Sequence, residues 1–360
     1  MRKTKFDNND VMRLASLLKE SRRIVVTCHL SPDGDALGSS LGLKRFLSCF
    51  NPTAKVTVVT PDEPTRTLSF LPGFREILPF SRCASKTERT IAEADLLVCL
   101  DFNVLQRTDL LAPALEKCKA TKILIDHHLS PDDFATLKFS YPEKCATCML
   151  LFELIEAAGL EKFVDSKTAT CILAGMMTDT GDFSYNVSDP EIYNVIARLI
   201  ALGANKGWLT RLLFNTFSES NLRIQGFALA EKMEVFHEMH AALVTLSRED
   251  LNRFSYQKGD TEGLVNKPMA IPGILYSCYL RQETDYIKVS MRSLGDFPVN
   301  RICEEYFGGG GHLNAAGGEF YGTMDECVSL FKKILNDNYE KYIATSSVLT
   351  SILKEELRQK

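Results

Sequence analysis

The sequence of 360 residues contains no long apolar run and no start that resembles a secretory leader. A membrane-spanning helix needs roughly 20 consecutive apolar residues, and no stretch of the chain approaches that length. The first ten residues, MRKTKFDNND, are basic but lead into no apolar segment, as a signal peptide would. We therefore expect a cytoplasmic protein that does not bind a membrane.

An excess of positive charge is also missing. The 46 acidic residues outnumber the 42 basic ones, and the formal net charge is −4. Proteins that grip long nucleic acids usually carry a basic stripe or a high pI. This balance argues against binding of long duplexes and leaves a small or short anionic ligand open.

Paired zinc ligands are the third absence. Cys145 and Cys148 form one CxxC among eleven cysteines, but no second ligand pair follows at zinc spacing. The cysteines are scattered through apolar stretches such as LLVCLD, where a reduced thiol packs as a small hydrophobe. We expect both thiols of the CxxC to lie on the buried side of a helix.

The first half of the chain alternates short β-rich runs with helical patterns. Four runs predict strands: RRIVVTC, KVTVVT, ADLLVCLD and KILIDHH. This alternation is typical of an α/β fold with a doubly wound parallel sheet and helices on both faces. Helical patterns follow at 145–159 and 166–179, and the one at 188–203 opens with a capping box of Ser188 and Glu191.

The length exceeds that of a usual single domain, so we expect two domains, each with its own core. We predict a catalytic metal-binding domain over 1–190, a helical linker over 191–236, a smaller α+β domain over 237–345 and a tail over 346–360. The α+β domain is indicated by strand-like segments, ILYSCYLRQ and DYIKVSMRS, and by the glycine-rich GGGGHLNAAGG. The tail has the pattern of an amphipathic helix.

Acidic and imidazole side chains gather where three predicted strands end. VVTCHLSPDGD supplies His29, Asp33 and Asp35, LLVCLD supplies Asp101, ILIDHH supplies Asp126, His127 and His128, and GMMTDTGDF supplies Asp179 after a helix. Because the carboxyl ends of parallel strands share one edge, where ligands bind, these residues should converge. An isolated aspartate after a strand is usually a cap or turn residue, but several such endings together favour a site.

Carboxylates mixed with imidazole suit a borderline divalent ion such as Mn²⁺. Four carboxylates balance the charge of two such ions, and a metal pair is the usual arrangement for in-line displacement at phosphorus. We therefore predict two Mn²⁺ ions, for which Mg²⁺ or Co²⁺ could substitute. His237 and His240, in FHEMH, lack acidic neighbours at metal spacing and predict surface or packing roles.

The motifs HLSPDGDALGS, LD at Asp101, DHH at 126–128 and TDT at 178–180 resemble, in this order, the four motifs of the DHH phosphoesterase superfamily. FGGGGHLNAAGG resembles the signature of the DHH-associated C-terminal domain, so the resemblance spans 29–318. Size and domain pairing resemble the nanoRNase (oligoribonuclease) and pAp-phosphatase branch, whose members are cytoplasmic.

The resemblance implies a role for each motif residue. One Mn²⁺ would be bound by His29, Asp33 and Asp101, and the other by Asp35, Asp101, His127 and Asp179, with Asp101 bridging the two. Asp101, His128 and Asp126 would be the catalytic residues, with His128 facing the scissile phosphate and Asp126 orienting its neighbours. Asn103 and Arg107 lie where superfamily members vary, so their roles stay open.

Candidate substrate contacts lie in the second half of the chain. Glycine has no Cβ, so the N–H groups of Gly309, Gly310 and Gly311 can approach an anion, and His312 can donate a hydrogen bond to the same phosphate. Arg292 could make a charge-assisted phosphate contact or could be a solvated strand residue. With metals on one domain and this loop on the other, we expect the active site in the cleft between them.

The resemblance implies hydrolysis of short oligoribonucleotides (nanoRNA, pApA) to 5′-mononucleotides, dephosphorylation of 3′-phosphoadenosine 5′-phosphate (pAp) to AMP, or both. A cyclic di-AMP phosphodiesterase is the alternative. A single-strand exonuclease would usually add a nucleic-acid-binding domain, and a family-II pyrophosphatase would replace GGGGH with a basic cluster. An inactive nucleotide sensor would have little reason to keep four clustered carboxylates. The expected partners are short RNA or small nucleotides, and a homodimer would be consistent with the family.

Overall fold

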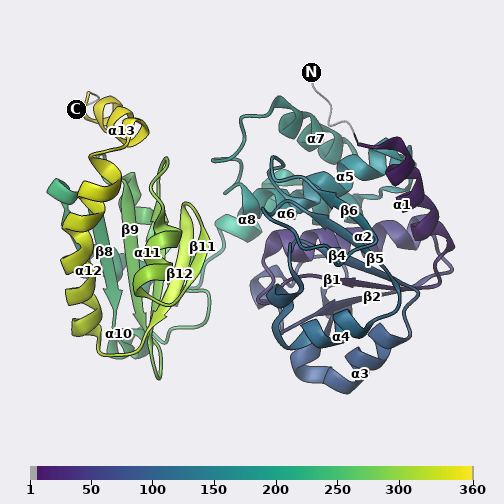
Figure 1. Ribbon diagram of the computed structural model, residues 1–360, viewed down its shortest axis with the longest axis horizontal. Helices are drawn as coiled ribbons and strands as arrows, with labels where there is room; N and C mark the ends of the chain where they lie inside the picture. The colour runs from purple at the N-terminus through teal and green to yellow at the C-terminus, as the bar shows by residue number, and fades with distance from the viewer. Residues whose placement is uncertain (1–5, 359–360) are drawn as a thin grey trace. The chain divides into compact units, whose positions relative to one another are not determined.

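The structure, a computed structural model, describes residues 6–358 of the chain. They form two compact units that divide between Thr216 and Phe217 (Figure 1). Of the segment predicted as a linker, two helices belong to the first unit, and one helix and one strand belong to the second. Among the described helices, none combines the length and the apolar character that a bilayer-crossing segment needs.

The first unit is built on a six-stranded parallel sheet with the order β3-β2-β1-β4-β5-β6. Its strands are β1 (Arg23–Thr27), β2 (Lys55–Thr60), β3 (Leu78–Pro79), β4 (Leu96–Leu100), β5 (Thr121–Asp126) and β6 (Leu137–Ser140). The four predicted strands are confirmed as β1, β2, β4 and β5, and so is the doubly wound α/β class. The two short edge strands, β3 and β6, were not among the predictions.

Alternate residues of the central strands face two different cores, which explains why these strands are apolar throughout. In β4, Leu96 and Val98 pack on one face and Leu97 and Cys99 on the other. The first face is covered by α1 (Asn8–Glu20), α2 (Gly34–Phe50), α5 (Thr147–Ala157), α6 (Ser166–Asp179), α7 (Pro190–Ala201) and α8 (Lys206–Phe214). The second face is covered by α3 (Phe80–Ala92) and α4 (Ala112–Lys117).

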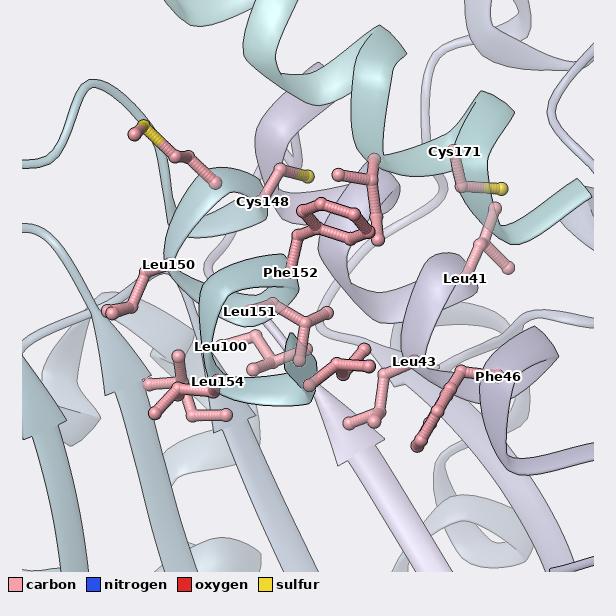
Figure 2. Close-up of a cluster of buried hydrophobic side chains, with 14 of the residues drawn as sticks. Leu41, Leu43, Phe46, Leu100, Cys148, Leu150, Leu151, Phe152, Leu154 and Cys171 are labelled. Atoms are coloured by element: carbon pink, nitrogen blue, oxygen red, sulfur yellow. The ribbon is translucent and has the colours of Figure 1, made fainter. Parts of the chain in front are cut away.

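Two glycines let helices α2 and α6 approach each other closely. A Cβ atom on Gly38 would lie 2.6 Å from the carbonyl oxygen of Cys171, and one on Gly175 would lie 3.0 Å from the Cα atom of Asp35. Figure 2 shows the core beside this contact, where side chains of α2, α5 and α6 meet. The close packing brings the start of α2 next to the end of α6, where Asp179 lies.

Helix α7 begins one residue later than the sequence pattern indicates. Asp189 is its N-cap, and the Asp189 carboxylate accepts a hydrogen bond of 2.9 Å from the backbone N–H of Glu191. Pro190 fills the first helical position, where a missing N–H costs nothing. The predicted capping box of Ser188 and Glu191 is therefore wrong, and the Glu191 carboxylate binds Arg198 at 2.6 Å instead.

The second unit contains a mixed six-stranded sheet with the order β11-β12-β10-β9-β8-β7, in which β8 and β9 are parallel and the other neighbours antiparallel. Its strands are β7 (Met233–Phe236), β8 (Ala241–Leu246), β9 (Tyr276–Gln282), β10 (Ile287–Ser293), β11 (Gly310–His312) and β12 (Ala315–Phe320). Its helices are α9 (Glu219–Glu231), α10 (Arg248–Arg253), α11 (Val299–Tyr306), α12 (Met324–Asn338) and α13 (Ser347–Leu357). The predicted α+β character of this half is confirmed.

Candidate metal centre

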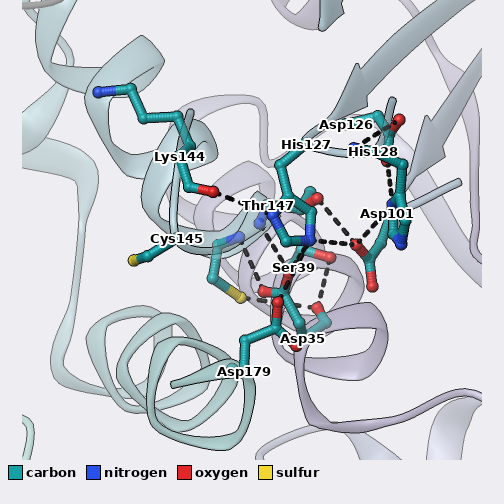
Figure 3. A network of polar contacts seen from close by, with 12 residues as sticks. Asp35, Ser39, Asp101, Asp126, His127, His128, Lys144, Cys145, Thr147 and Asp179 are labelled. Carbon is teal, nitrogen blue, oxygen red and sulfur yellow. Dashed lines mark hydrogen bonds and ion pairs between the residues drawn. The ribbon is translucent and has the colours of Figure 1, made fainter. Parts of the chain in front are cut away.

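The predicted ligands converge at the carboxyl ends of β1, β4 and β5. Figure 3 shows four of them, Asp35, Asp101, His127 and Asp179. Three groups have ligand atoms within 4.8 Å of one another: His29 with Asp33 and Asp101, Asp35 with His127 and Asp179, and Asp101 with His127 and His128. Asp101 takes part in two of these groups. The parallel sheet therefore assembles the cluster from segments that lie far apart in the sequence.

The first group is centred on the Nε2 atom of His29. This atom lies 3.4 Å from Oδ2 of Asp101 and 3.8 Å from Oδ1 of Asp33. The other ring nitrogen, Nδ1, lies 2.7 Å from the carbonyl oxygen of Leu30, to which it can donate. A histidine held in this way presents Nε2 as a metal ligand, the usual arrangement at protein metal sites. Asp33 is fixed as the N-cap of α2.

The second group repeats this arrangement around His127. Its Nε2 atom lies 3.2 Å from Oδ2 of Asp179, 3.6 Å from Oδ1 of Asp101 and 3.9 Å from Oδ2 of Asp35. Its Nδ1 atom lies 3.1 Å from the carbonyl oxygen of Lys144. Both imidazoles are thus anchored by a backbone carbonyl and turn the opposite nitrogen toward carboxylates.

Asp101 connects the two groups through its two carboxylate oxygens. Oδ2 faces His29, and Oδ1 faces His127. Asp101 is 2% exposed, and its backbone φ of 66° lies in the left-handed region that residues other than glycine seldom adopt. Strained backbone of this kind tends to occur at functional sites, and here it occurs at the residue whose carboxylate faces both His29 and His127.

His128, which belongs to the third group, also contacts Asp126 at the end of β5. The Nδ1 atom of His128 lies 2.7 Å from Oδ1 of Asp126, and the backbone N–H of His128 donates to Oδ2 at 3.1 Å. Asp126 is fully buried. These contacts fix the imidazole ring, as the orienting role predicted for Asp126 requires.

The charges of the cluster are strongly coupled. Burial, reinforced by the carboxylates of Asp101 and Asp179, raises the pKa of Asp35 well above its usual range, and burial raises the pKa of Asp179 to about 6. Burial, the largest single effect, would lower the pKa of His29, but the hydrogen bonds and charges of Asp101 and Asp33 together outweigh it and raise the value to about 11. Burial would likewise lower the pKa of His127, but the hydrogen bond to Asp179 and the carboxylate charges of Asp101, Asp35 and Asp179 together raise it to about 10.

These shifts indicate that the clustered carboxylates are stabilised by positive charge close to them. Protons on the imidazoles can supply it, and so can divalent cations, which displace protons when they bind imidazole and carboxylate ligands. The donor atoms, oxygen and imidazole nitrogen, suit such cations. The residues present therefore fit a pair of divalent ions.

Hydrogen bonds join the three loops that carry the ligands. The N–H of Leu30, after β1, donates to the carbonyl oxygen of Arg107 at 2.8 Å. The side-chain amide of Asn103, after β4, donates to the carbonyl oxygen of Leu129 at 2.6 Å. The backbone carbonyl oxygen of Asn103 accepts a hydrogen bond from the N–H of Asp132 at 2.9 Å. Asn103, whose role the sequence leaves open, thus ties the loop after β4 to the loop that follows the DHH residues.

Comparison with known proteins agrees with this geometry. Residues 23–176 match the N-terminal domain of the DHH family, and residues 241–341 match the DHHA1 domain. The bifunctional oligoribonuclease and PAP phosphatase NrnA of Thermus thermophilus is 32% identical over 300 residues, which cover 83% of this chain and 84% of that protein. The chain belongs to the DHH family. The predicted resemblance to the DHH phosphoesterase superfamily and to its nanoRNase branch is confirmed.

Two further similarities bear on this DHH protein. The cyclic-di-AMP phosphodiesterase PdeA of Listeria monocytogenes is 26% identical over 312 residues, which cover 84% of this chain but 45% of PdeA. The crystal structure of an exopolyphosphatase-related protein from Bacteroides fragilis has a TM-score of 0.91 and 41% identity, and the match covers 94% of this chain and 99% of the other. The fold is thus shared almost end to end with a solved structure.

In the DHHA1 region, two of the predicted substrate contacts lie on one face of the sheet, on either side of β12. Arg292 of β10 pairs with Ala315 of β12, and Ala315 pairs with His312 of β11. Residues paired across neighbouring strands project from the same face of a sheet. The adjacent row of Met291, Ala316 and Gly311 faces the other way, with Met291 and Ala316 in the core.

The predicted glycine loop has a packing reason for its composition. A Cβ atom on Gly309 would collide with the carbonyl oxygen of Gly317, and one on Gly311 would lie 2.6 Å from that of Ala315. Gly310 has more room, since its nearest neighbour would be the Glu304 side chain at 3.7 Å. The close pairing of β11 with β12 thus requires glycine at two positions, and anion binding by Gly309, Gly310 and Gly311 stays a prediction.

Proposed function

We propose that this protein is a divalent-metal-dependent phosphoesterase that hydrolyses short oligoribonucleotides such as pApA to 5′-mononucleotides and dephosphorylates pAp to AMP. The position of Asp101 carries this conclusion, because its two oxygens face two separate histidine-containing groups. The similarity to NrnA of Thermus thermophilus, named as an oligoribonuclease and PAP phosphatase, supports the choice of substrate. We also propose a cytoplasmic location and a homodimer, as expected from the sequence.

We propose two Mn²⁺ ions as the cofactor, with Mg²⁺ or Co²⁺ as substitutes. His29, Asp33 and Asp101 would hold one ion, and Asp35, Asp101, His127 and Asp179 would hold the other. Such a pair of ions activates water and neutralises the charge that develops on phosphoryl oxygens. The chain itself then needs to supply no nucleophile.

Residues other than the predicted metal ligands would bind and orient the substrate. Asp126 holds Nδ1 of His128 and so fixes the orientation of the ring that would face the scissile phosphate. Arg292 and His312 flank the small residue Ala315 on one sheet face, an arrangement that suits a phosphate or the end of a short nucleotide. We propose these residues, with the loop at Gly309, Gly310 and Gly311, as the substrate contacts of the second unit.

Hydrolysis of cyclic di-AMP is a second candidate activity. PdeA of Listeria monocytogenes, named as a cyclic-di-AMP phosphodiesterase, matches 84% of this chain. The same metal centre could serve either substrate, because both reactions break a phosphoester bond by attack of water. Substrate preference is therefore the point that needs measurement.

A rate comparison tests the proposed function. Purified protein with Mn²⁺ is assayed on pAp, pApA, RNA of two to five nucleotides, cyclic di-AMP and pyrophosphate. We expect the highest kcat/KM on pAp and the shortest RNA, and loss of turnover in Asp101→Asn. Asp133→Asn, a change at a side chain that is 94% exposed, is the matched control and should keep wild-type rates. Full turnover in Asp101→Asn, or a wild-type protein inactive on all five substrates, would contradict the proposal.

A further inference from the structure

The segment CATC, residues 145–148, supplies no ligand to the metal groups but contacts two of their carboxylates (Figure 3). The backbone N–H of Thr147 donates to Oδ2 of Asp35 at 2.6 Å, and the N–H of Cys148 donates to Oδ1 at 2.9 Å. The Thr147 hydroxyl donates to Oδ1 of Asp101 at 2.9 Å. Thr147, which belongs to none of the metal groups, therefore contacts Asp101, which faces both His29 and His127, and also Asp35 of the second group.

Helix α5 holds Asp35 by both of its oxygens. The two N–H groups that bind it belong to the first turn of α5, where backbone donors have no partner within the helix. Negative charge is favoured at this end of a helix. Because Thr147 and Asp35 are fully buried, no water competes for these bonds, and the plane of the Asp35 carboxylate is fixed.

The Thr147 hydroxyl fixes Asp101 in a different way, through one oxygen only. That oxygen, Oδ1, also lies 3.6 Å from Nε2 of His127, while Oδ2 lies 3.4 Å from Nε2 of His29. A carboxylate oxygen has lone pairs for more than one partner, so the hydroxyl does not block a ligand role. Holding Oδ1 in place also determines where Oδ2 points, because the two oxygens share one rigid plane.

We propose that Thr147 is a positioning residue for the two-metal centre. Its N–H and its hydroxyl hold Asp35 and Asp101 so that each metal group receives its carboxylate oxygen. We infer this role on the basis of the proposed function, in which the two groups hold divalent ions. In the sequence, CATC stands out only for its two cysteines, and the residue that serves the site lies between them.

The substitution Thr147→Val separates the two contacts. Valine keeps the volume and the branched Cβ atom and retains the backbone N–H, so the bond to Asp35 stays while the bond to Asp101 is lost. Loss of a group that orients a metal ligand typically weakens metal binding about 10- to 100-fold. We expect a loss in this range for Mn²⁺, and near-wild-type affinity in Thr147→Ser, which restores the hydroxyl.

Thr168→Val is the matched control. Thr168 is also fully buried, lies in the first turn of a helix and donates its hydroxyl to an aspartate, Asp165, at 2.8 Å. Asp165 belongs to none of the metal groups found among the described residues. The control therefore removes the same kind of hydrogen bond without touching a predicted ligand.

The experiment titrates metal-free full-length protein with Mn²⁺ and follows the free ion by electron paramagnetic resonance, alongside melting of the metal-free form. We expect both valine variants to melt earlier than wild type, and Thr147→Val alone to bind Mn²⁺ more weakly. Wild-type affinity in Thr147→Val, or an equal loss in Thr168→Val, would overturn the positioning role. Should Thr147→Val not fold, Thr147→Ala serves for the same comparison.

Wild-type hydrolysis, measured in parallel, separates this inference from the proposed function. A wild-type protein that binds two Mn²⁺ ions but hydrolyses no substrate would overturn the function, and weak binding by Thr147→Val would still support the positioning role. If the wild-type protein is active but Thr147→Val binds Mn²⁺ with unchanged affinity, the proposed function is supported and the positioning role is overturned.

Discussion

The buried ion pair of Lys144 and Glu153 lies behind His127 and offers a sharp test of what stabilises the first unit. The Lys144 ammonium lies 2.8 Å from Oε1 and 2.6 Å from Oε2 of Glu153, and the two side chains are 3% and 8% exposed. Burial raises the pKa of Glu153, which reflects the cost of placing its charge away from water. The same Lys144 contributes the carbonyl oxygen that anchors His127.

We predict that Glu153→Leu strongly destabilises the protein. Removing one partner of a buried pair leaves the other charge uncompensated and costs about 3–5 kcal/mol. In a unit of 216 residues, 1 kcal/mol corresponds to about 2–4 °C in Tm, so the expected fall is roughly 6–20 °C. The double variant Lys144→Met/Glu153→Leu should recover most of this loss, because apolar residues of similar volume replace both charges.

The assay is calorimetric melting of metal-free protein at pH 7 for the wild type, both variants and a control. The control is Glu93→Leu, which removes an exposed pair with Arg89 and should leave Tm almost unchanged. A Tm of Glu153→Leu within 2 °C of wild type, or a double variant as unstable as the single one, would refute the reasoning from uncompensated charge.

Three further outcomes are expected. Gly175→Ala should weaken Mn²⁺ binding in calorimetric titration, since a Cβ there meets the backbone of α2 at 3.0 Å, and unchanged affinity would count against the glycine contact. Asn103→Ala should speed amide hydrogen exchange in the loop after the DHH residues, because it removes a 2.6 Å hydrogen bond; protection equal to wild type would show that the bond does not restrain the loop. Burial alone would raise the pKa of Asp165, but the hydrogen bonds from Thr168 and the contact with Arg45 together outweigh it and lower the pKa. The stabilisation that the Asp165 carboxylate provides is therefore fully present above its unfolded-state pKa of about 4, and it is lost as the pH falls through its folded-state pKa. In urea unfolding measured across acidic pH, Asp165→Asn should reduce the decrease of the unfolding free energy as the pH falls. An unchanged pH dependence would contradict this role of Asp165.

The core of the site was predictable because it follows from strand ends. An apolar run that ends at Asp101 or at Asp126 predicts both a strand and the position of its carboxyl end. In a parallel sheet these ends lie at the same edge, so the residues that follow them are brought together. The edge strands β3 and β6 gave no comparable signal, since they are 2 and 4 residues long. The capping box expected at Ser188 failed because Pro190 fixes where the helix starts.

Residues that orient the ligands could not be predicted in this way. Thr147 matters because the first turn of α5 packs on the start of α2, a tertiary contact between segments 112 residues apart. Asn103 matters because its amide reaches a carbonyl oxygen 26 residues further along the chain. Neither position belongs to a charged cluster, so only the folded chain reveals what they contact.

The most direct test of the two-metal centre is anomalous diffraction at the manganese absorption edge from crystals of the protein soaked in Mn²⁺. We predict two anomalous peaks, one beside His29 and one beside His127, each adjacent to a different oxygen of Asp101. A single peak, or peaks that do not adjoin Asp101, would contradict the assignment of this carboxylate as the bridge.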